Sequence, residues 1–575
     1  MTETARSAPR GAAGGAEPAP AHAAGRRPAA GEGAERLTLA ALLGAVAAAV
    51  PERTAVVAGD RRATYAGLLA RADRLAAHLA GAGVAPGEPV AVLAHNRLEW
   101  LEAFFGALRA GAVPVNVNHR YIESELVHVL ADSGSVALVA ERALAARLRR
   151  AAPALPRLRR LLLLADPAGA APPGGPAGPA GVEQTGYEDA LAAAADHLVP
   201  ALPAPGREAR YLLYTGGTTG RPKGVVWRQC DLFRAALELR PPGAPRAASP
   251  EEVAERARAR SPRRLLVLGP LMHAAGQWNA LGTLFTGGTV VLSTAPAFDA
   301  EAAVRLADRE RVHAVQVVGD AMARPLAQRL TAVPDRCTDL TTVTSGGTPL
   351  TPAVRDLWLA WRPGIAVHDS YGGSETGVCG VAGGGAPRFS VGASVAVLDE
   401  RLRPLPPGSA RVGRIARTGR IPLGYHNDPA GTARTFPVDA EGRRWVLSGD
   451  YGTVEADGTV TLLGRGSAVI NTAGEKVFAE EVESVVKAHP GVEDAIVVAA
   501  PDDLLGQRVT AIVAPAPGGG PDADALRDHC RSRLAGFKVP RSIHFVDRVR
   551  RTAVGKQDYR WAAGVARSGR GSARG

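Results

Sequence analysis

A short stretch after residue 213 combines residue types that suit a polyphosphate ligand. Tyr214–Val225 reads YTGGTTGRPKGV, so glycines are mixed with hydroxyl side chains and one lysine. Glycine lets the backbone approach a ligand closely, and hydroxyl and ammonium groups bind phosphate oxygens. The Walker A pattern does not fit, because Lys223 lies between a proline and a glycine. The predicted phosphate-binding residues are Thr215, Gly216, Gly217, Thr218, Thr219, Gly220 and Lys223.

This stretch resembles the phosphate-binding signature of the AMP-forming adenylating enzymes, the superfamily of acyl-CoA synthetases, luciferases and peptide-synthetase adenylation domains. Other segments that resemble superfamily motifs follow between about residues 36 and 565. The resemblance implies ATP, Mg²⁺ and CoA as cofactors and a carboxylic acid as substrate. Taken singly, most of these segments would be interpreted as turns or solvated charges.

The segment Asp369–Glu375, of sequence DSYGGSE, resembles the adenine and magnesium motif of these enzymes. The resemblance implies that Tyr371 packs on the adenine beside Gly372. It implies that Ser374 faces the α-phosphate and that Glu375 is a catalytic residue and the magnesium ligand. An aromatic face, a hydroxyl and a hard carboxylate oxygen suit a base, a phosphate and Mg²⁺ respectively.

The remaining nucleotide residues lie in the last quarter of the chain. Asp450 resembles the ribose-binding aspartate, whose carboxylate accepts from both ribose hydroxyls. Arg465 matches the joint between two domains, and Ser467 is the expected hinge residue although Asp or Lys is common there. Lys556, in the segment Arg551–Lys556, resembles the catalytic lysine, which offsets the repulsion between a carboxylate and a triphosphate.

Two segments resemble the walls of an acyl site. Thr344–Pro349 resembles the segment between nucleotide and acyl group, in which Gly346 and Gly347 permit close approach. Pro270–Trp278 resembles the entry to the acyl-pocket helix and supplies His273 as a third catalytic candidate, with an ordinary core histidine as the alternative. The pocket residues expected here are Met272, Ala274, Ala275, Trp278, Gly346 and Gly347. This apolar set predicts hydrophobic acids over acetate, since each buried methylene contributes about 0.8 kcal/mol.

Composition limits the class of protein. The chain has 575 residues, a net charge of +12 and 46% apolar residues, which predicts one large and one smaller globular domain. No basic stripe with interleaved aromatics indicates nucleic acid, so anionic small molecules are the expected partners. Four dispersed cysteines and the lack of a signal peptide favour the cytoplasm. No apolar stretch reaches membrane-spanning length, although peripheral membrane contact stays open, and the oligomeric state is not indicated.

Hydrophobic patterns predict the elements that carry these motifs. Leu68, Ala72, Leu75 and Leu79 form a helical stripe, and such helices alternate with short apolar strands such as Thr289–Leu292. Arg210–Tyr214 is predicted to be a buried strand that enters the phosphate loop. The loop is expected to lead to a helix, from the spacing of Leu232, Ala235, Ala236 and Leu239. Pro241–Arg263, rich in proline and charge, is expected to be an exposed insertion.

The predicted fold class is α/β, with a large layered N-terminal adenylation domain and a small mobile α+β C-terminal lid domain. The predicted boundaries are a disordered tail at 1–35, the adenylation domain at 36–464, the lid at 465–565 and a second disordered tail at 566–575. Asp457-Gly458 between Val454 and Val460 predicts a hairpin just before the joint.

The predicted activity is that of an AMP-forming carboxylate:CoA ligase. Trp227-Arg228, Pro270–Trp278, Val318–Pro325 and Ile470–Val477 resemble actinobacterial fatty-acyl-CoA synthetases, including those that act on sterol-derived carboxylates. Two alternatives stay open. One is a ligase that loads the acyl group on a carrier protein or stops at acyl-AMP, and the other is a non-catalytic nucleotide-binding protein of the same fold.

Overall fold

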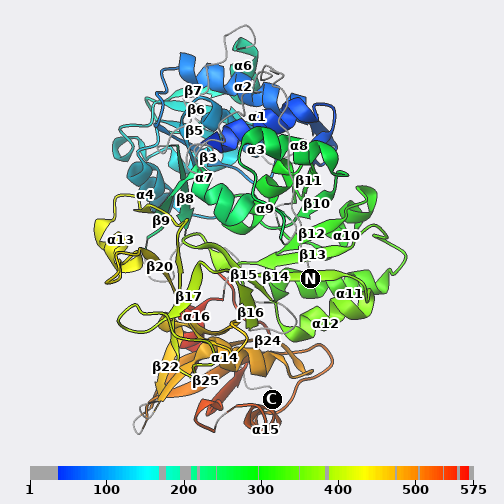
Figure 1. The fold of residues 1–575 in the computed structure, drawn as a ribbon, viewed down its shortest axis with the longest axis vertical. Coiled ribbons are helices and arrows are strands. Elements are labelled where there is room, and N and C mark those ends of the chain that lie inside the picture. The colour runs from blue at the N-terminus through cyan, green and yellow to red at the C-terminus, as the bar shows by residue number, and fades with distance from the viewer. Residues whose placement is uncertain are drawn as a thin grey trace, which may run out of the picture.

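The computed structural model describes residues 36–166, 177–194, 209–215, 221–240, 243–295, 297–348, 350–382, 388–472, 475–502, 505–534, 536–552 and 557–568. The predicted tail at 1–35 and residues 569–575 lie outside this set. Within the described part the chain forms three sheets with helices packed around them, and Figure 1 shows them following one another along the long axis. The predicted α/β fold class, with a large first domain and a small second one, is confirmed.

The first sheet has eight strands in the order β19-β9-β8-β4-β3-β5-β6-β7. They are β3 (Pro89–Leu93), β4 (Val113–Asn116), β5 (Ala137–Glu141), β6 (Arg160–Leu164), β7 (Glu183–Gly186), β8 (Arg210–Thr215), β9 (Lys223–Arg228) and β19 (Gly424–Tyr425). β3 to β8 pair in parallel, whereas β9 runs antiparallel to β8. Every residue of β5 is buried, as a parallel strand covered on both faces requires.

The first helices belong to this part of the molecule. They are α1 (Leu39–Ala49), α2 (Tyr65–Gly81), α3 (Leu98–Arg109), α4 (Glu123–Ser133), α5 (Arg142–Ala145) and α6 (Tyr187–Ala193). The predicted stripe of α2 is buried in the main core. Thr64 caps the N-terminus of α2, because its hydroxyl accepts a hydrogen bond of 3.0 Å from the Gly67 N–H.

The second sheet has thirteen strands, in the order β17-β18-β20-β21-β16-β15-β14-β13-β12-β10-β11-β1-β2. They are β1 (Thr54–Ala58), β2 (Arg61–Thr64), β10 (Arg264–Val267), β11 (Thr289–Leu292), β12 (Ala314–Val317), β13 (Thr342–Gly346), β14 (Ala366–Gly373), β15 (Gly377–Ala382), β16 (Arg388–Val391), β17 (Val395–Leu398), β18 (Gly413–Thr418), β20 (Trp445–Val454) and β21 (Val460–Arg465). β1 and β10 to β14 are parallel, and the remaining neighbours pair antiparallel. The hairpin predicted at Asp457-Gly458 joins β20 to β21.

Helices of the second half pack between and beside the sheets. They are α7 (Gln229–Leu232), α8 (Pro250–Ala259), α9 (Ala274–Phe285), α10 (Ala300–Arg309), α11 (Asp320–Ala332), α12 (Pro352–Trp361) and α13 (Pro429–Thr435). Figure 1 shows α9 between β8 and β10. The largest hydrophobic cluster contains Leu281 and Leu284 of α9 with Leu213 of β8 and Val267 of β10. One core therefore joins the two large sheets through α9.

The C-terminal region folds around a third, smaller sheet. Its elements are β22 (Val469–Thr472), β23 (Glu475–Phe478), α14 (Ala479–Lys487), β24 (Val492–Asp502), β25 (Gly506–Pro515), α15 (Ala523–Arg531), β26 (Ser542–Phe545) and α16 (Tyr559–Ser568). A cluster of its own, with Ile470, Val482 and Val513 at the centre, fills the space between sheet and helices. Helix α16 runs to Ser568, past Ala566, because Ala566 is buried against β24 and β25.

Two predictions about single elements are wrong. The phosphate loop does not lead to a helix: it joins β8 to β9, whose Val225 and Val226 extend the sheet before α7 begins. The segment 243–263 is not merely an exposed insertion either. It contains α8, which is capped by Ser249, packs on α1 and buries Val253 and Ala257 in the main core.

Candidate active site

The ends of the β8–β9 hairpin hold the described part of the predicted phosphate loop. Thr215 lies opposite Lys223 across the two strands, whereas Gly216, Gly217, Thr218, Thr219 and Gly220 lie outside the described residues. Lys223 Nζ is 2.8 Å from Asp428 Oδ2 and 5.0 Å from the centre of the Tyr425 ring. Lys223 also holds the pKa of the Asp428 carboxyl below its usual range. Neither Asp428 nor Tyr425 was predicted from the sequence.

Asn116 fixes the strand that leads into this loop. Its side chain, buried at 5% exposure at the end of β4, accepts from the Tyr214 N–H at 2.7 Å and donates to the Tyr214 carbonyl at 3.1 Å. It also donates to the carbonyl of Met272, just before α9. One buried amide therefore connects the phosphate loop to the predicted acyl segment. No local pattern marks Asn116, because its partners are far away in the sequence.

Three predicted nucleotide residues, from β14, β20 and β21 of the thirteen-stranded sheet, lie in contact with one another. The Tyr371 hydroxyl donates to Asp450 Oδ2 at 2.7 Å, and Arg465 Nε donates to Asp450 Oδ1 at 3.0 Å. Asp450 is only 7% exposed. Burial opposes the charge of Arg465, but the neighbouring Asp450 carboxylate still raises the pKa of its guanidinium. Burial also raises the pKa of Tyr371 well above its usual range, so this phenol stays a hydrogen-bond donor.

The β14–β15 turn carries Glu375 toward the phosphate-loop hairpin. The Tyr425 hydroxyl donates to Glu375 Oε1 at 3.1 Å, and Trp227 Nε1 donates to the Ser374 carbonyl at 2.8 Å. A side chain at Gly372 would collide with the Gly377 carbonyl, at 2.1 Å from an added Cβ, so this tight turn requires glycine. β19, β9 and the turn thus hold Glu375 beside Tyr425, and Tyr425 beside Lys223.

Glu375 suits Mg²⁺, because its charged, hard oxygen ligand lies beside the predicted phosphate site. Within the described ranges no group of three or more His, Cys, Asp or Glu residues could hold a metal ion. Magnesium in nucleotide sites commonly takes one or two carboxylates and completes its shell with phosphate oxygens and water. The donor set therefore fits a metal that arrives with a nucleotide.

Gly346 and Gly347 lie at the end of β13, against the start of α9. Gly346 pairs with Ser370 of β14. Gly347 has φ +91°, which other residues rarely adopt, and an added Cβ would lie 3.9 Å from the Ala275 Cβ. His273 is the N-cap residue of α9, and its carbonyl accepts from the Gln277 N–H at 3.0 Å. The structure therefore brings the predicted nucleotide and acyl segments together.

The joint before the lid is tightly packed. Gly464 has φ +133°, and a Cβ there would lie 2.2 Å from Glu480 Oε2 of α14. The Arg465 N–H donates to the Glu480 carboxylate at 3.3 Å, and burial raises the pKa of Glu480. Ser467 lies in a short turn, and its side chain is outside the described set. The same holds for the whole of Lys556.

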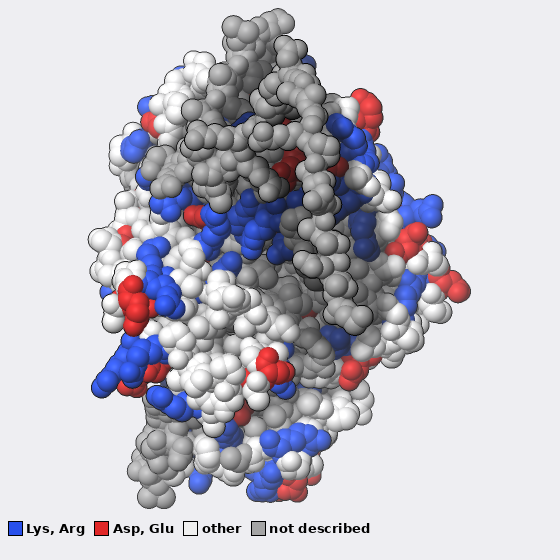
Figure 2. Space-filling model, viewed as in Figure 1, with Lys and Arg blue, Asp and Glu red and all other residues white. Residues whose placement is uncertain are grey.

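One face of the molecule is strongly basic. Figure 2 shows Lys and Arg gathered in a band across the upper half of the view, with fewer Asp and Glu beside them. This band accords with the net charge of +12 and would attract anionic ligands. In the part of the chain that is described, no helix is long and apolar enough to cross a membrane.

Comparison with known proteins agrees with this geometry. The AMP-binding enzyme family matches residues 43–423, and the AMP-binding enzyme C-terminal domain matches residues 481–556. The chain is 39% identical over 534 residues to the 3-oxocholest-4-en-26-oate--CoA ligase of Rhodococcus rhodochrous, covering 89% of this chain and 93% of the relative. It is 41% identical over 549 residues to the medium-chain acyl-CoA ligase Mig of Mycobacterium avium, covering 91% and 97%.

Solved structures show the same fold. The anthranilate CoA ligase AuaEII in complex with anthranoyl-AMP superposes with a TM-score of 0.78 at 21% identity, over 93% of this chain and 98% of the other. ATP-bound MatB from Rhodopseudomonas palustris superposes with a TM-score of 0.74 at 25% identity, over 92% and 98%.

Proposed function

This chain belongs to the AMP-binding enzyme family, and on that basis we propose that it is an AMP-forming ligase that joins a hydrophobic carboxylic acid to CoA. In the first half-reaction the acid's carboxylate attacks the α-phosphate of ATP, which gives acyl-AMP and releases pyrophosphate. In the second the CoA sulfur attacks the acyl carbonyl and AMP leaves. The two CoA ligases compared above, at 39% and 41% identity over most of both chains, support this assignment.

The observation that carries the proposal is the convergence of Tyr371 and Arg465 on one buried carboxylate, Asp450. Two vicinal hydroxyls can donate to the two oxygens of a carboxylate, so Asp450 suits a ribose. The ring of Tyr371 offers a face for the adenine. Arg465 balances the charge of Asp450 and lies at the joint, where it can sense the position of the lid.

Several protein groups interact with the charged triphosphate. Lys223 and the phosphate loop bind the phosphate oxygens, and Glu375 would hold Mg²⁺. Bound there, the metal would neutralise phosphate charge and orient the triphosphate. Lys556 approaches the α-phosphate from the lid and stabilises the charge that develops during attack. A turn of the lid about Arg465 and Ser467 then withdraws Lys556 and opens a path for the CoA sulfur.

The acid binds between α9 and the end of β13. Met272, just before α9, is 1% exposed, and a Cβ on Gly347 would lie 3.9 Å from the Ala275 Cβ of α9. Trp278 of α9 is 6% exposed and packs against Trp227 and Tyr211 of the eight-stranded sheet. The relatives' names, which include a medium-chain acyl-CoA ligase and a sterol-acid CoA ligase, support a hydrophobic acid for this chain. His273, the N-cap residue of α9, is the candidate that contacts the reacting carboxylate. The four cysteines are buried as free thiols, which supports a cytoplasmic location.

Pyrophosphate release tests the proposal. The purified chain is assayed with acetate, octanoate, palmitate, a benzoate, a steroid acid and an amino acid, each with and without CoA. We expect acyl-CoA, AMP and pyrophosphate with at least one hydrophobic acid. Acyl-AMP that accumulates despite added CoA would favour a carrier-loading ligase, and no turnover of any acid would favour a non-catalytic protein. Preference for acetate or the amino acid would contradict the proposed apolar pocket but not the proposed ligase reaction.

A further inference from the structure

The carboxyl ends of β3 and β5 in the eight-stranded sheet lie at a position where proteins of this topology bind ligands. β3 is the first of the parallel strands, β4 lies on one side of it and β5 on the other. The chain therefore adds β4 on one side of β3 and then crosses to add β5 on the other side. In open parallel sheets, ligands bind outside the carboxyl ends of the strands at such a reversal point. Glu141 is the last residue of β5, and His95 follows β3. These two residues occupy the reversal point.

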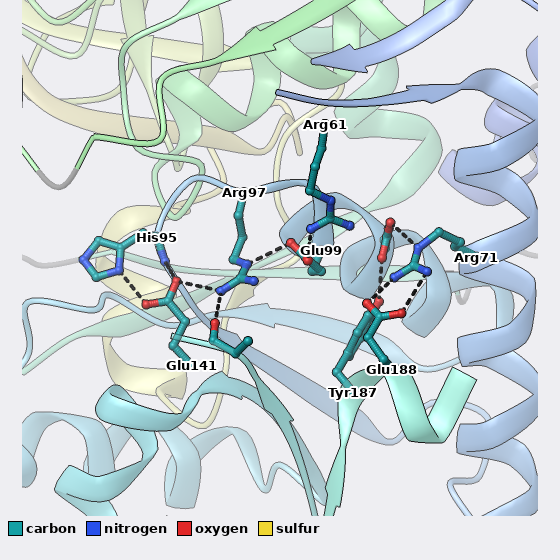
Figure 3. A network of polar contacts seen from close by, with 10 residues as sticks. Arg61, Arg71, His95, Arg97, Glu99, Glu141, Tyr187 and Glu188 are labelled. Carbon is teal, nitrogen blue, oxygen red and sulfur yellow. Dashed lines mark hydrogen bonds and ion pairs between the residues drawn. The ribbon is translucent and has the colours of Figure 1, made fainter. Parts of the chain in front are cut away.

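Glu141 orients His95. Its carboxylate is 2% exposed and lies 2.7 Å from His95 Nδ1, and it accepts from the His95 N–H at 3.0 Å. Arg97 lies 3.5 Å from the same carboxylate and donates to Glu99 at 2.8 Å (Figure 3). The imidazole therefore presents its N–H to Glu141 and turns Nε2 away. Nε2 has no hydrogen-bond partner among the residues that the structure describes.

His119 lies beside His95, with ring centres 4.1 Å apart. It is 9% exposed, and its buried Nδ1 has no hydrogen-bond partner in the described part of the chain. Burial, helped by the nearby His95, lowers the pKa of His119 to about 3, so the ring is neutral. A buried polar atom without a partner is costly in a folded protein and calls for an explanation. A bound ligand would supply the missing partner.

The two rings adjoin the acyl segment. Asn96, next to His95, donates to the Gly269 carbonyl at 3.1 Å and accepts from the Leu271 N–H at 2.8 Å. Asn116, three residues before His119, donates to the Met272 carbonyl. Both histidine loops are therefore attached to the segment that enters α9, and this segment contributes to the proposed acyl pocket.

We propose that His95 and His119 form a polar subsite of the acyl pocket that binds a hydroxyl or ketone oxygen on an otherwise hydrophobic acid. This inference rests on the proposed function and narrows its substrate class. Two imidazoles offer N–H donors and lone-pair acceptors, and these match a neutral oxygen group. Glu141 and Arg97 form an ion pair with each other, while Arg120 acts electrostatically on His119. Glu141 is a positioning residue, since it acts through His95.

The test compares acids that differ by one oxygen. Dodecanoate is paired with hydroxydodecanoates substituted at successive positions, and a saturated steroid acid with its oxo derivative. We expect kcat/KM to favour one oxygenated member by about tenfold or more, because a site built around a hydrogen bond rejects the analogue without it. His119→Phe and His95→Phe should bring that ratio close to one. Glu141→Gln should lower the ratio partway.

Glu99→Gln is the matched control. Glu99 belongs to the same chain of ion pairs, and among the described residues its carboxylate pairs with Arg61 and Arg97 and with no histidine (Figure 3). Its change should therefore lower the melting temperature and leave the ratio unaltered. Equal use of plain and oxygenated acids by the unmodified protein would overturn the subsite. Histidine variants that keep the ratio would also overturn the subsite. Variants that instead raise KM for CoA would overturn it too, because they would indicate that the histidines bind the pantetheine arm of CoA. If no acid is turned over, the proposed function fails, and calorimetric binding of the same pairs still decides the subsite.

Discussion

At the scale of single residues, the proposal separates the two half-reactions. Lys556→Ala should lose acyl-adenylate formation by about a hundredfold or more, since one group that stabilises transition-state charge is removed. It should still convert supplied acyl-AMP and CoA to the thioester. Burst measurements of pyrophosphate and single-turnover thioester formation distinguish the two steps. Equal loss in both would rule out the role given to Lys556.

Glu375 and Asp450 should differ in what they bind. Glu375→Gln should raise the Mg²⁺ concentration needed for half-maximal rate, because the amide keeps an oxygen but loses the charge that a hard dication favours. Asp450→Ala should raise KM for ATP with little change in magnesium dependence. Magnesium titrations at fixed ATP test both variants. An unchanged metal requirement in Glu375→Gln would make that residue structural.

Asn116 should contribute strongly to stability. Asn116→Ala leaves the Tyr214 and Met272 backbone groups without buried partners, and we expect a loss of about 2 kcal/mol in the free energy of unfolding. Asn279→Ala removes a single bond to the α9 backbone and serves as the control, with a smaller loss. Urea titration measures both. Equal losses would show that Asn116 contributes no more to the free energy of unfolding than a side chain with a single hydrogen bond to the backbone.

At the scale of elements, Glu483 of α14 predicts a pH dependence of lid stability. Burial raises its pKa to about 7, although Gln557 and Tyr559 donate to its carboxylate at 3.0 and 3.3 Å. The pKa of Glu483 is higher in the folded protein than its unfolded value of about 4.5. Its contribution to the free energy of unfolding is therefore fully present below pH 4.5 and is lost as pH rises through about 7. Glu483→Gln should remove this part of the decline. Melting curves from pH 4.5 to 8 compare the two proteins, and parallel curves would contradict the assignment.

Strands and helices with strong periodicity could be predicted from the sequence. The strand expected at Thr289–Leu292 is β11, and the stripe from Leu68 to Leu79 is the buried face of α2. The helix expected after the phosphate loop failed for a physical reason. Leu232 and Ala235 do lie in helical turns, but Val225 to Trp227 first pair with β8, and β-branched residues favour that extended partner.

Site residues with long-range partners could not be predicted. Asp428 pairs with Lys223 across 205 positions, and Asn116 reaches Tyr214 across 98, so no local pattern connects them. Glu375, Asp450 and Arg465 were proposed from their motifs, which are short and contiguous, and their roles stay predictions. The contact of Tyr371 and Arg465 with Asp450 became visible only when β14, β20 and β21 were aligned in one sheet.

At the scale of the whole molecule, the basic surface predicts sensitivity to salt. The net charge of +12 should draw CoA and ATP toward the chain, and salt screens this attraction over about 10 Å at 0.1 M. We expect KM for CoA to rise between 0.02 and about 0.3 M salt. Dephospho-CoA carries less charge and should show a shallower rise in the same assay. Equal slopes for the two thiols would exclude long-range attraction.

The lid sheet encloses a core of its own, built around Ile470, Val482 and Val513, whereas the core on the other side of the joint includes Tyr371 and Val460. Among the described residues no hydrophobic cluster contains members from both sides of residues 464–467. A recombination breakpoint in that interval would leave every cluster intact. Such an exchange would still have to preserve the contacts that cross the joint, among them the rings of Tyr451 and Phe478 and the Glu480 carboxylate beside Gly464.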